Sequence, residues 1–393
     1  MKKSLLFPLL ALLVSLTGLA CQTVSSATTP YGGVIRIGHN APFTGAIPLV
    51  ALSGREAIDL WLEEHNNQIE LDGKVYRFEI IERDNQTSPE VAARITEELI
   101  TEHDILAMIG PYASAQAIPA GEVANRLKTP MISPWSTNPN TTRNRPYVFR
   151  IPFLDDFQAE VIAYFLAEEQ RVQNVAILYS EQSDYSRDIA RFFRENAQAS
   201  GMNIVFDESF DANDLVNISS HLERLAQTNA EVLFLPQYYN EVPIIVNQLA
   251  QIGWTGRVIG SDSWASTELL TACGINCEGF YFSTHWTPSN TSEPAQRFIK
   301  LYQARYNRLP DDLAALTWDA MEILALGLQN CGSLSGNLEQ DRECLQQGLA
   351  AIDAFEGATG KMRFNEEGDP IKCVLLVRIE SQQAQFYKQV CPR

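Results

Sequence analysis

The sequence predicts an α/β protein with parallel-type sheets arranged in two lobes. Short β-branched runs alternate with amphipathic helical segments between about residues 34 and 260, and this alternation is typical of parallel sheets covered by helices on both faces. The predicted strands are apolar along their length, as expected for strands buried on both faces. The alternation stops after about residue 290, which indicates that the chain crosses between the lobes more than once. At roughly 150 residues per domain, 393 residues suffice for two or three domains.

The predicted elements follow in this order. The first strands are expected at 34–38, 75–83, 105–110, 130–133, 175–179, 203–207, 232–235 and 257–260. The helices between and after them are expected at 54–66, 89–103, 115–127, 156–169, 186–198, 217–227 and 241–252. Three helices then succeed one another at 294–307, 313–329 and 338–351, and short strands close the chain at 361–364, 373–379 and 386–390.

The N-terminus has the pattern of an export signal. Lys2 and Lys3 precede an apolar run over residues 5–19, so we predict a signal peptide at residues 1–20. The apolar run is too short for a membrane-spanning helix. Cys21 directly follows a small residue, as in a bacterial lipoprotein signal, and it is the predicted lipidation site; the alternative is ordinary cleavage that leaves a spare cysteine. Residues 21–32 are rich in Ser and Thr and are typical of a flexible tether.

Six further cysteines also favour an exported protein. They allow fifteen pairings, and proximity in the sequence suggests three short loops: Cys273–Cys277, Cys331–Cys344 and Cys373–Cys391. Free or metal-bound thiols are the alternative, but paired Cys-x-x-Cys spacing is absent.

Composition and missing motifs exclude several functions. The chain has 30 Lys plus Arg against 48 Asp plus Glu, a net charge of −18, without the basic clusters that a nucleic-acid binder needs. The five histidines are too far apart in the sequence for a local zinc site. Phosphate-binding, dinucleotide-binding and hydrolase motifs are absent. We therefore expect no catalytic residues, no metal and no cofactor; an enzyme with an unrecognised site is the alternative.

Hydroxyl groups stand where two predicted strands end. Ser114 ends the segment 109–114 and opens the next helix, and Thr137 lies in the segment 132–139. A hydroxyl at a helix N-terminus, backed by free N–H groups, is suited to an anion, and ligands of open α/β sheets lie outside the carboxyl ends of the strands. The structural alternative is that Ser114 only caps its helix and Thr137 only makes a turn.

Six segments, in order, resemble one known family. They are residues 35–45 (IRIGHNAPFTG), 108–114 (MIGPYAS), 130–139 (PMISPWSTNP), 234–239 (FLPQYY), 253–262 (GWTGRVIGSD) and 278–282 (EGFYF). They resemble the type I periplasmic binding proteins of ABC transporters, most closely the leucine/isoleucine/valine-binding branch, over about residues 33–390. The resemblance implies two Rossmann-like lobes with three hinge crossings that close on a ligand. Lobe 1 would comprise 33–153 plus 285–352, and lobe 2 would comprise 154–284 plus 353–393.

The resemblance also implies a ligand site. Its residues are Ser114, Trp135, Thr137, Tyr185, Tyr238 and Asp262. Ser114 and Thr137 match hydroxyls that hold an α-carboxylate, the backbone of Trp135 matches a ligand contact, and Asp262 matches the acid that holds an α-ammonium. Tyr185 and Tyr238 match aromatic positions on the second lobe. Charge-assisted hydrogen bonds of this kind are strong, and placing the two ends on opposite lobes makes the ligand a bridge.

The implied function is capture of an amino acid, branched-chain or otherwise apolar, by a monomer that delivers it to the permease subunits of an ABC importer. The alternatives are another small molecule, such as an amide, urea or an aromatic acid, or a sensor role. Residues 46–53 depart from the family in being shorter by about three residues and strongly apolar. They are expected either to shape a pocket for the ligand side chain or to pack against their own lobe. His285 and Trp286, at a predicted crossing, are further candidates to line the cleft.

Overall fold

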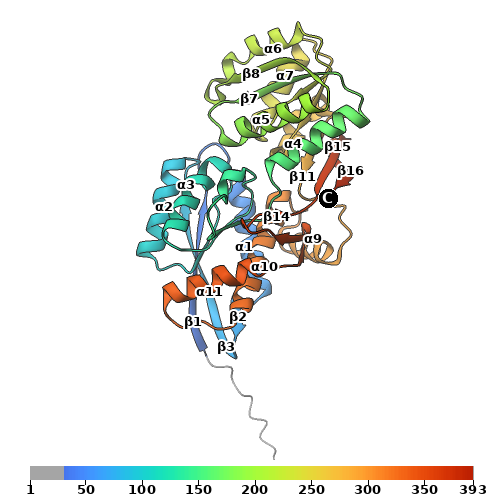
Figure 1. Cartoon of the computed structure of the whole chain (residues 1–393). Helices are drawn as coiled ribbons and strands as arrows, with labels where there is room; N and C mark the ends of the chain where they lie inside the picture. Colours follow the sequence, from blue (N-terminus) through green and yellow to red (C-terminus); the bar gives the residue numbers. More distant parts are fainter. Residues whose placement is uncertain (1–30, 393) are drawn as a thin grey trace, which may run out of the picture.

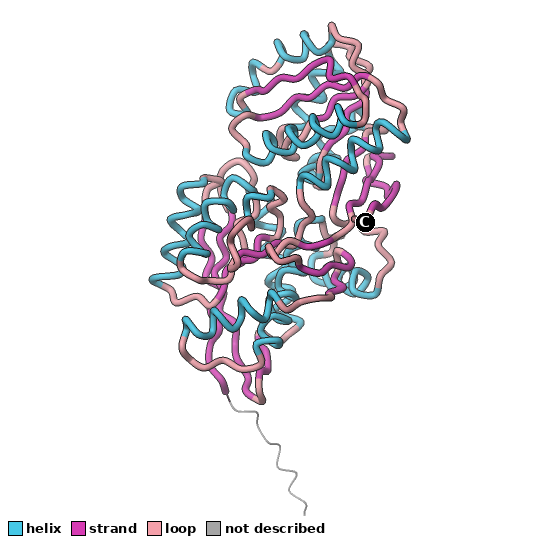
Figure 2. The backbone as a smooth tube through the Cα atoms, viewed as in Figure 1, coloured by secondary structure: helices cyan, strands magenta, loops and turns pink. Residues whose placement is uncertain are grey.

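The computed structural model describes residues 31–392 (Figure 1). The predicted signal peptide, Cys21 and nearly all of the predicted tether lie outside the described residues. Within residues 31–392, no helix combines the length and the apolar character needed to cross a bilayer. Strands lie inside each lobe, and helices cover them from outside (Figure 2).

The first lobe contains a six-stranded sheet in the order β2-β3-β1-β4-β5-β6. Its strands are β1 (Tyr31–Ala41), β2 (Gln68–Leu71), β3 (Lys74–Asp84), β4 (Ala107–Ile109), β5 (Met131–Ser133) and β6 (Val148–Arg150). Only β2 and β3 pair antiparallel. The covering helices are α1 (Pro48–Glu64), α2 (Pro89–Glu102), α3 (Ser114–Arg126), α10 (Asp312–Cys331) and α11 (Leu338–Ala350). Helices α2 and α3 pack together, as do α1 and α10, so both faces of the sheet are buried.

The second lobe contains a seven-stranded sheet in the order β16-β15-β11-β10-β9-β7-β8. Its strands are β7 (Asn174–Ser180), β8 (Asn203–Phe210), β9 (Val232–Phe234), β10 (Arg257–Gly260), β11 (Tyr281–Thr284), β15 (Val374–Glu380) and β16 (Gln383–Val390). Strands β7 to β11 run parallel, and β15 and β16 are antiparallel additions at one edge. The accompanying helices are α4 (Asp155–Tyr164), α5 (Asp184–Ala199), α6 (Ser219–Ala226), α7 (Val242–Gln251) and α8 (Thr267–Cys273).

The chain passes between the lobes after β6, after β11 and before β15, and α9 (Glu293–Tyr306) follows the second passage (Figure 1). A small antiparallel sheet of β12 (Phe355–Gly357), β13 (Gly360–Phe364) and β14 (Pro370–Ile371) precedes the third. Asp319 of α10 accepts hydrogen bonds from the N–H groups of Ala358 and Thr359, at 2.7 and 2.8 Å. The lobe division stays a proposal, and these contacts favour a third boundary near residue 372 rather than 353.

The predicted α/β fold of two lobes with three crossings is confirmed, with one informative difference. Helix α1 begins at Pro48, six residues before the predicted helix, because proline is well suited to the first turn of a helix. Ile47, Val50 and Ala51 are fully buried in the core of lobe 1, whereas Leu49 and Leu52 are exposed. The segment 46–53 thus packs partly against its own lobe, its Ala46 carbonyl accepts a hydrogen bond from Asn240 of lobe 2 at 3.1 Å, and none of its residues lines the ligand cavity described below.

The structure brings together the three cysteine pairs suggested by the sequence. Their Cα atoms lie 5.6, 5.4 and 4.0 Å apart for Cys273–Cys277, Cys331–Cys344 and Cys373–Cys391. We propose that all three are disulfide bonds, which stabilise a fold mainly by restricting the unfolded chain.

Reduction should lower the thermal stability of the protein without abolishing ligand binding, because none of the six cysteines lines the cavity. The two longer loops, with separations of 13 and 18 residues, should each contribute about 3 kcal/mol. Calorimetry with and without a phosphine reductant measures the effect, and the Cys331→Ser/Cys344→Ser variant should reproduce part of it without reductant. An unchanged melting temperature after complete reduction would contradict the pairing.

Candidate ligand-binding site

The six predicted site residues all follow the carboxyl ends of parallel strands. Ser114 follows β4, Trp135 and Thr137 follow β5, Tyr185 follows β7, Tyr238 follows β9, and Asp262 follows β10. Parallel strands end at one edge of their sheet, so each lobe gathers its site residues at one edge. The two edges face each other between the lobes.

One small cavity lies between these edges. It is lined by Ala113, Ser114, Trp135, Tyr185, Tyr238, Asp262 and Ser263. The structure thus brings five of the six predicted residues to one space, and Thr137 lies outside its lining. The cavity volume is only about 10 Å³, measured for the centre of a water molecule, which is room for about one water. An amino acid can therefore enter only if the lobes separate or the walls move.

The lobes touch across this cavity. The Trp135 and Tyr238 rings lie 5.9 Å apart, and Tyr238 in turn stacks on Tyr185 at 5.7 Å. The Asn138 amide of lobe 1 donates to Asp188 Oδ2 of lobe 2, at 2.8 Å. These contacts define a closed arrangement with an aromatic wall around the cavity.

The lobe 1 side presents hydroxyls that do no structural capping. Ser114 is the first residue of α3, whose N-cap is Ala113, so Ser114 does not cap its helix and that alternative is wrong. Its Oγ accepts a hydrogen bond from Ser136 Oγ at 3.0 Å. The Thr137 hydroxyl is buried and faces the Asp155 carboxyl rather than a backbone group of its own turn. The Ser114 hydroxyl is therefore the lobe 1 hydroxyl in the cavity lining that can donate to an anion beside the N-terminus of α3.

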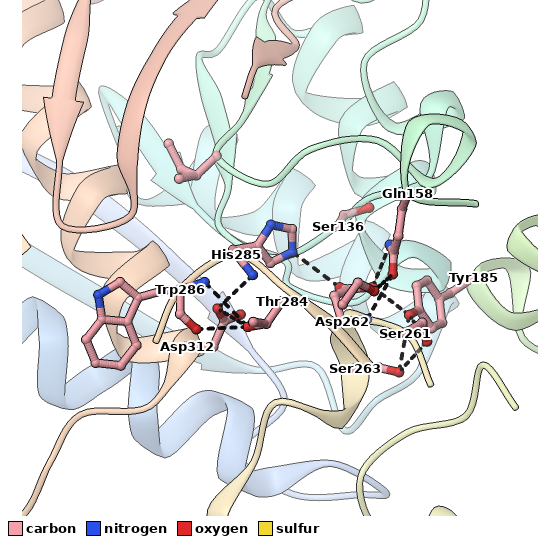
Figure 3. A network of polar contacts seen from close by, with 12 residues as sticks. Ser136, Gln158, Tyr185, Ser261, Asp262, Ser263, Thr284, His285, Trp286 and Asp312 are labelled. Carbon is pink, nitrogen blue, oxygen red and sulfur yellow. Dashed lines mark hydrogen bonds and ion pairs between the residues drawn. The ribbon is translucent and has the colours of Figure 1, made fainter. Parts of the chain in front are cut away.

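The lobe 2 side presents Asp262, held by a network of polar side chains (Figure 3). Asp262 Oδ1 accepts from the Tyr185 hydroxyl at 2.6 Å and from Gln158 Nε2 at 2.8 Å, and its backbone N–H donates to Gln158 Oε1 at 2.9 Å. Among residues 31–392, Asp262 Oδ2 accepts a side-chain hydrogen bond only from His285 Nε2, at 3.4 Å. One carboxylate oxygen is thus firmly held, and the other is largely available.

Every donor to Asp262 is neutral. Burial raises the pKa of the Tyr185 phenol well above its usual value, and the charge of Asp262 adds to the shift, so the hydroxyl keeps its proton. Burial lowers the pKa of His285 to about 4, so its imidazole is uncharged at neutral pH. Gln158 carries no charge. The network therefore orients the carboxylate without neutralising it, which suits a ligand that brings its own cation.

A buried ion pair holds the segment that carries Thr137. Arg150, fully buried at the end of β6, pairs through Nε with Asp369 Oδ1 at 2.7 Å. The same guanidinium donates to the backbone oxygens of Ser136 and Asn138, at 3.1 and 2.7 Å. Asp369 lies beside the small sheet, more than 200 residues away in the sequence, so this support was not predicted.

Removing Asp369 should leave Arg150 charged and unpaired. We expect Asp369→Ala to lower the free energy of unfolding by about 3–5 kcal/mol and to weaken ligand binding, because the loop around Thr137 loses its anchor. Urea unfolding and titration calorimetry measure the two effects. Ala in place of the nearby exposed Glu367 is the matched control. Wild-type ligand affinity in Asp369→Ala would show that the loop is held by other contacts.

Asp155 is a second acidic group that sequence reasoning missed. It is the first residue of α4, it is fully buried, and its carboxyl faces the Thr137 hydroxyl. Its backbone N–H donates to the Thr137 carbonyl at 3.0 Å, which places it behind the site. Burial and the charge of Asp262 raise its pKa well above the usual value. No local sequence pattern distinguishes this residue from its exposed neighbour Asp156.

Asp155→Asn should therefore stabilise the protein at pH 8 more than at pH 5. A folded-state pKa above the unfolded value contributes stability at low pH, and this stability is lost as the pH rises through the folded-state pKa. Asn cannot ionise, so the Asp155→Asn variant does not lose this stability at high pH. Urea unfolding at both pH values tests it, with Asp156→Asn as the exposed control. An equal effect of Asp155→Asn at pH 5 and pH 8 would contradict the shift.

Comparison with known proteins identifies the family. Residues 34–384 match the periplasmic binding protein family. The chain belongs to this family. Its members are solute-binding proteins rather than enzymes, and membership implies a location outside the cytoplasm. The resemblance seen in the sequence is confirmed.

Similar proteins include several that bind amino acids. The leucine-binding protein LivK of Thermotoga maritima is 28% identical with a TM-score of 0.85, over 91% of this chain and 99% of that one. LivJ of Streptococcus pneumoniae, solved with isoleucine, is 26% identical with a TM-score of 0.83, over 91% and 100%. A Pseudomonas aeruginosa protein that binds leucine, isoleucine, valine, threonine and alanine is 23% identical over 363 residues, 91% of each chain.

Proposed function

We propose that this protein captures an amino acid, branched-chain or otherwise apolar, between its lobes and delivers it to an ABC importer. One observation carries the proposal: a carboxylate held only by neutral donors, Asp262, faces the free hydroxyl of Ser114 across a shared cavity. A free amino acid has the two charges that match these ends. LivK binds leucine, LivJ was solved with isoleucine, and the Pseudomonas protein binds five amino acids, which supports the same ligand class.

The residue roles implied by the family resemblance are part of the proposal. Ser114 and Thr137 hold the α-carboxylate near the N-terminus of α3, and Asp262 holds the α-ammonium. The aromatic wall of Trp135, Tyr185 and Tyr238 borders the ligand and favours an apolar side chain. Because the charged ends are held by different lobes, the ligand stabilises the closed arrangement.

We also propose that the protein is a monomer exported by the signal at residues 1–20 and anchored to a membrane by a lipid on Cys21. The sequence pattern supports this, and the tether of residues 21–32 would separate the lobes from the membrane. Mass spectrometry of the purified mature protein would detect the lipid-modified N-terminal cysteine. A mature chain without lipid on Cys21 would contradict the anchor.

Titration calorimetry against the twenty amino acids, urea, short amides and benzoate tests the function. We expect leucine or a related amino acid to bind tightly and Asp262→Ala to abolish that binding. Ser114→Ala and Thr137→Ala should each weaken it by about 1–3 kcal/mol, the range for a lost hydrogen bond to a charged group. Thr101→Ala, at an exposed hydroxyl of α2, is the control.

Two results would overturn the proposal. Tight binding of urea, an amide or benzoate, with no amino acid bound, would assign another ligand class to this scaffold. Chemical conversion of the ligand during the titration would show an enzyme.

A further inference from the structure

His285 lies where the hinge meets the ligand site. It directly follows β11 at the second crossing and is fully buried. Its ring packs on Phe153 of the first crossing, with centroids 3.8 Å apart, and its backbone N–H donates to Asp312 Oδ1 at 3.2 Å. Its side chain points away from Asp312 and toward Asp262 (Figure 3). One residue thus touches both crossings, α10 and the acidic end of the site.

The two oxygens of Asp262 are held very differently. Oδ1 accepts short hydrogen bonds from Tyr185 and Gln158, whereas Oδ2 has only the His285 contact at 3.4 Å. Since a carboxylate can only accept, His285 donates through Nε2–H and carries its lone pair on Nδ1. Nδ1 is buried without a partner. Oδ2 is therefore the oxygen with capacity for an ammonium, and His285 is its only resident neighbour in the described network.

The titratable groups around His285 are Asp262 after β10, Asp312 at the start of α10, and Lys372 before β15; burial raises the pKa of Asp312 to about 8, so this carboxyl is protonated below neutral pH. Burial is the largest cause that lowers the His285 pKa to about 4, and Lys372 lowers it further, while Asp262 acts against them. The imidazole thus stays neutral at physiological pH although a carboxylate lies beside it. Lys372 does not hydrogen-bond to His285: its ammonium donates to the Ile151 carbonyl at 3.4 Å and to Thr359 Oγ1.

We propose that His285 is a specificity-determining residue, which orients Asp262 Oδ2 as a neutral donor and so reserves the charge of this carboxylate for the ammonium group of a ligand. The inference rests on the proposed function. A cation at position 285 would take the place of the ammonium beside Asp262. The site would then favour a ligand with a carboxylate and no ammonium. With such a ligand the Asp262 charge is already paired by the new cation, whereas an ammonium would have no carboxylate left to pair with.

Three variants at this position separate charge from shape. His285→Gln keeps a neutral donor, His285→Phe keeps a ring against Phe153 without the donor, and His285→Lys introduces a cation. The probes are leucine and 4-methylpentanoate, its analogue without the amino group, each titrated by calorimetry. Thermal melts show which variants fold, and His39→Gln, at another fully buried histidine that contacts Glu82 and Tyr112 in lobe 1, is the control.

The expected results differ for each variant. His285→Gln should keep leucine affinity within about threefold, and His285→Phe should weaken it about tenfold. His285→Lys should weaken leucine binding about 100-fold or more while 4-methylpentanoate binds at least as well as to the wild type. A His285→Lys variant that folds and keeps the wild-type preference for leucine over its analogue would overturn the inference.

Measuring leucine affinity as a function of pH tests the inference even if the His285→Lys variant does not fold. Leucine remains a zwitterion between pH 6 and pH 3.5, whereas His285 gains a proton near the lower end. Leucine affinity should then fall about two- to tenfold more in the wild type, and in His39→Gln, than in His285→Gln. Equal pH profiles for wild type and His285→Gln would overturn the inference. Failure of the wild type to bind any amino acid would instead overturn the proposed function.

Discussion

The ligand site depends on a buried carboxylate that the protein orients and leaves uncompensated. Burying a charge without a partner is costly, and proteins usually place a cation beside it. Asp262 has instead a phenol, an amide and a neutral imidazole. These donors reduce the cost by hydrogen bonding while the negative charge remains. In the function proposed above, the ligand supplies the missing cation, and the affinity for its ammonium group comes from pairing this charge.

The division of the site between lobes turns that affinity into a conformational preference. Ser114 and Thr137 lie on one lobe and Asp262 on the other, so neither lobe alone can bind both ends of a zwitterion. A ligand that contacts both lobes favours the closed arrangement by the difference between its affinities for closed and open states. The small cavity volume agrees with this view, because a site that closes tightly must open to load.

The sequence predicts site residues that stand close to the end of a strand, but not the side chains that reach the site from distant parts of the chain. Ser114, Trp135 and Asp262 stand within five residues of the ends of buried strands, so their meeting at the sheet edges could be predicted. Gln158 and His285 reach Asp262 from 104 and 23 residues away, and no local pattern marks them as its partners. The Arg150–Asp369 pair spans a still longer separation.

The segment 46–53 was ambiguous for a different reason. An apolar run fits a ligand pocket and a buried helix start equally well, and the burial of Val50 and Ala51 shows the second. Pro48 was the available signal, since proline is favoured in the first turn of a helix. The strands β2, β6, β11, β12 and β14 were missed, because short strands carry too few residues for a period to be read, whereas β13 was predicted.

The hinge and the acidic half of the site share His285. Strands β10 and β11 pair at Gly260 and Phe282, so Asp262 follows one strand of this edge and His285 follows its neighbour at the crossing. The His285 backbone is meanwhile bonded to Asp312 of α10, beside the pivot. Groups near a pivot move least when two lobes rotate. In the function proposed above, Tyr185, Gln158 and His285 orient Asp262 within its own half of the site, and closure brings the lobe 1 hydroxyls to a ligand held at its positive end. A preorganised half-site of this kind lowers the entropy lost on binding.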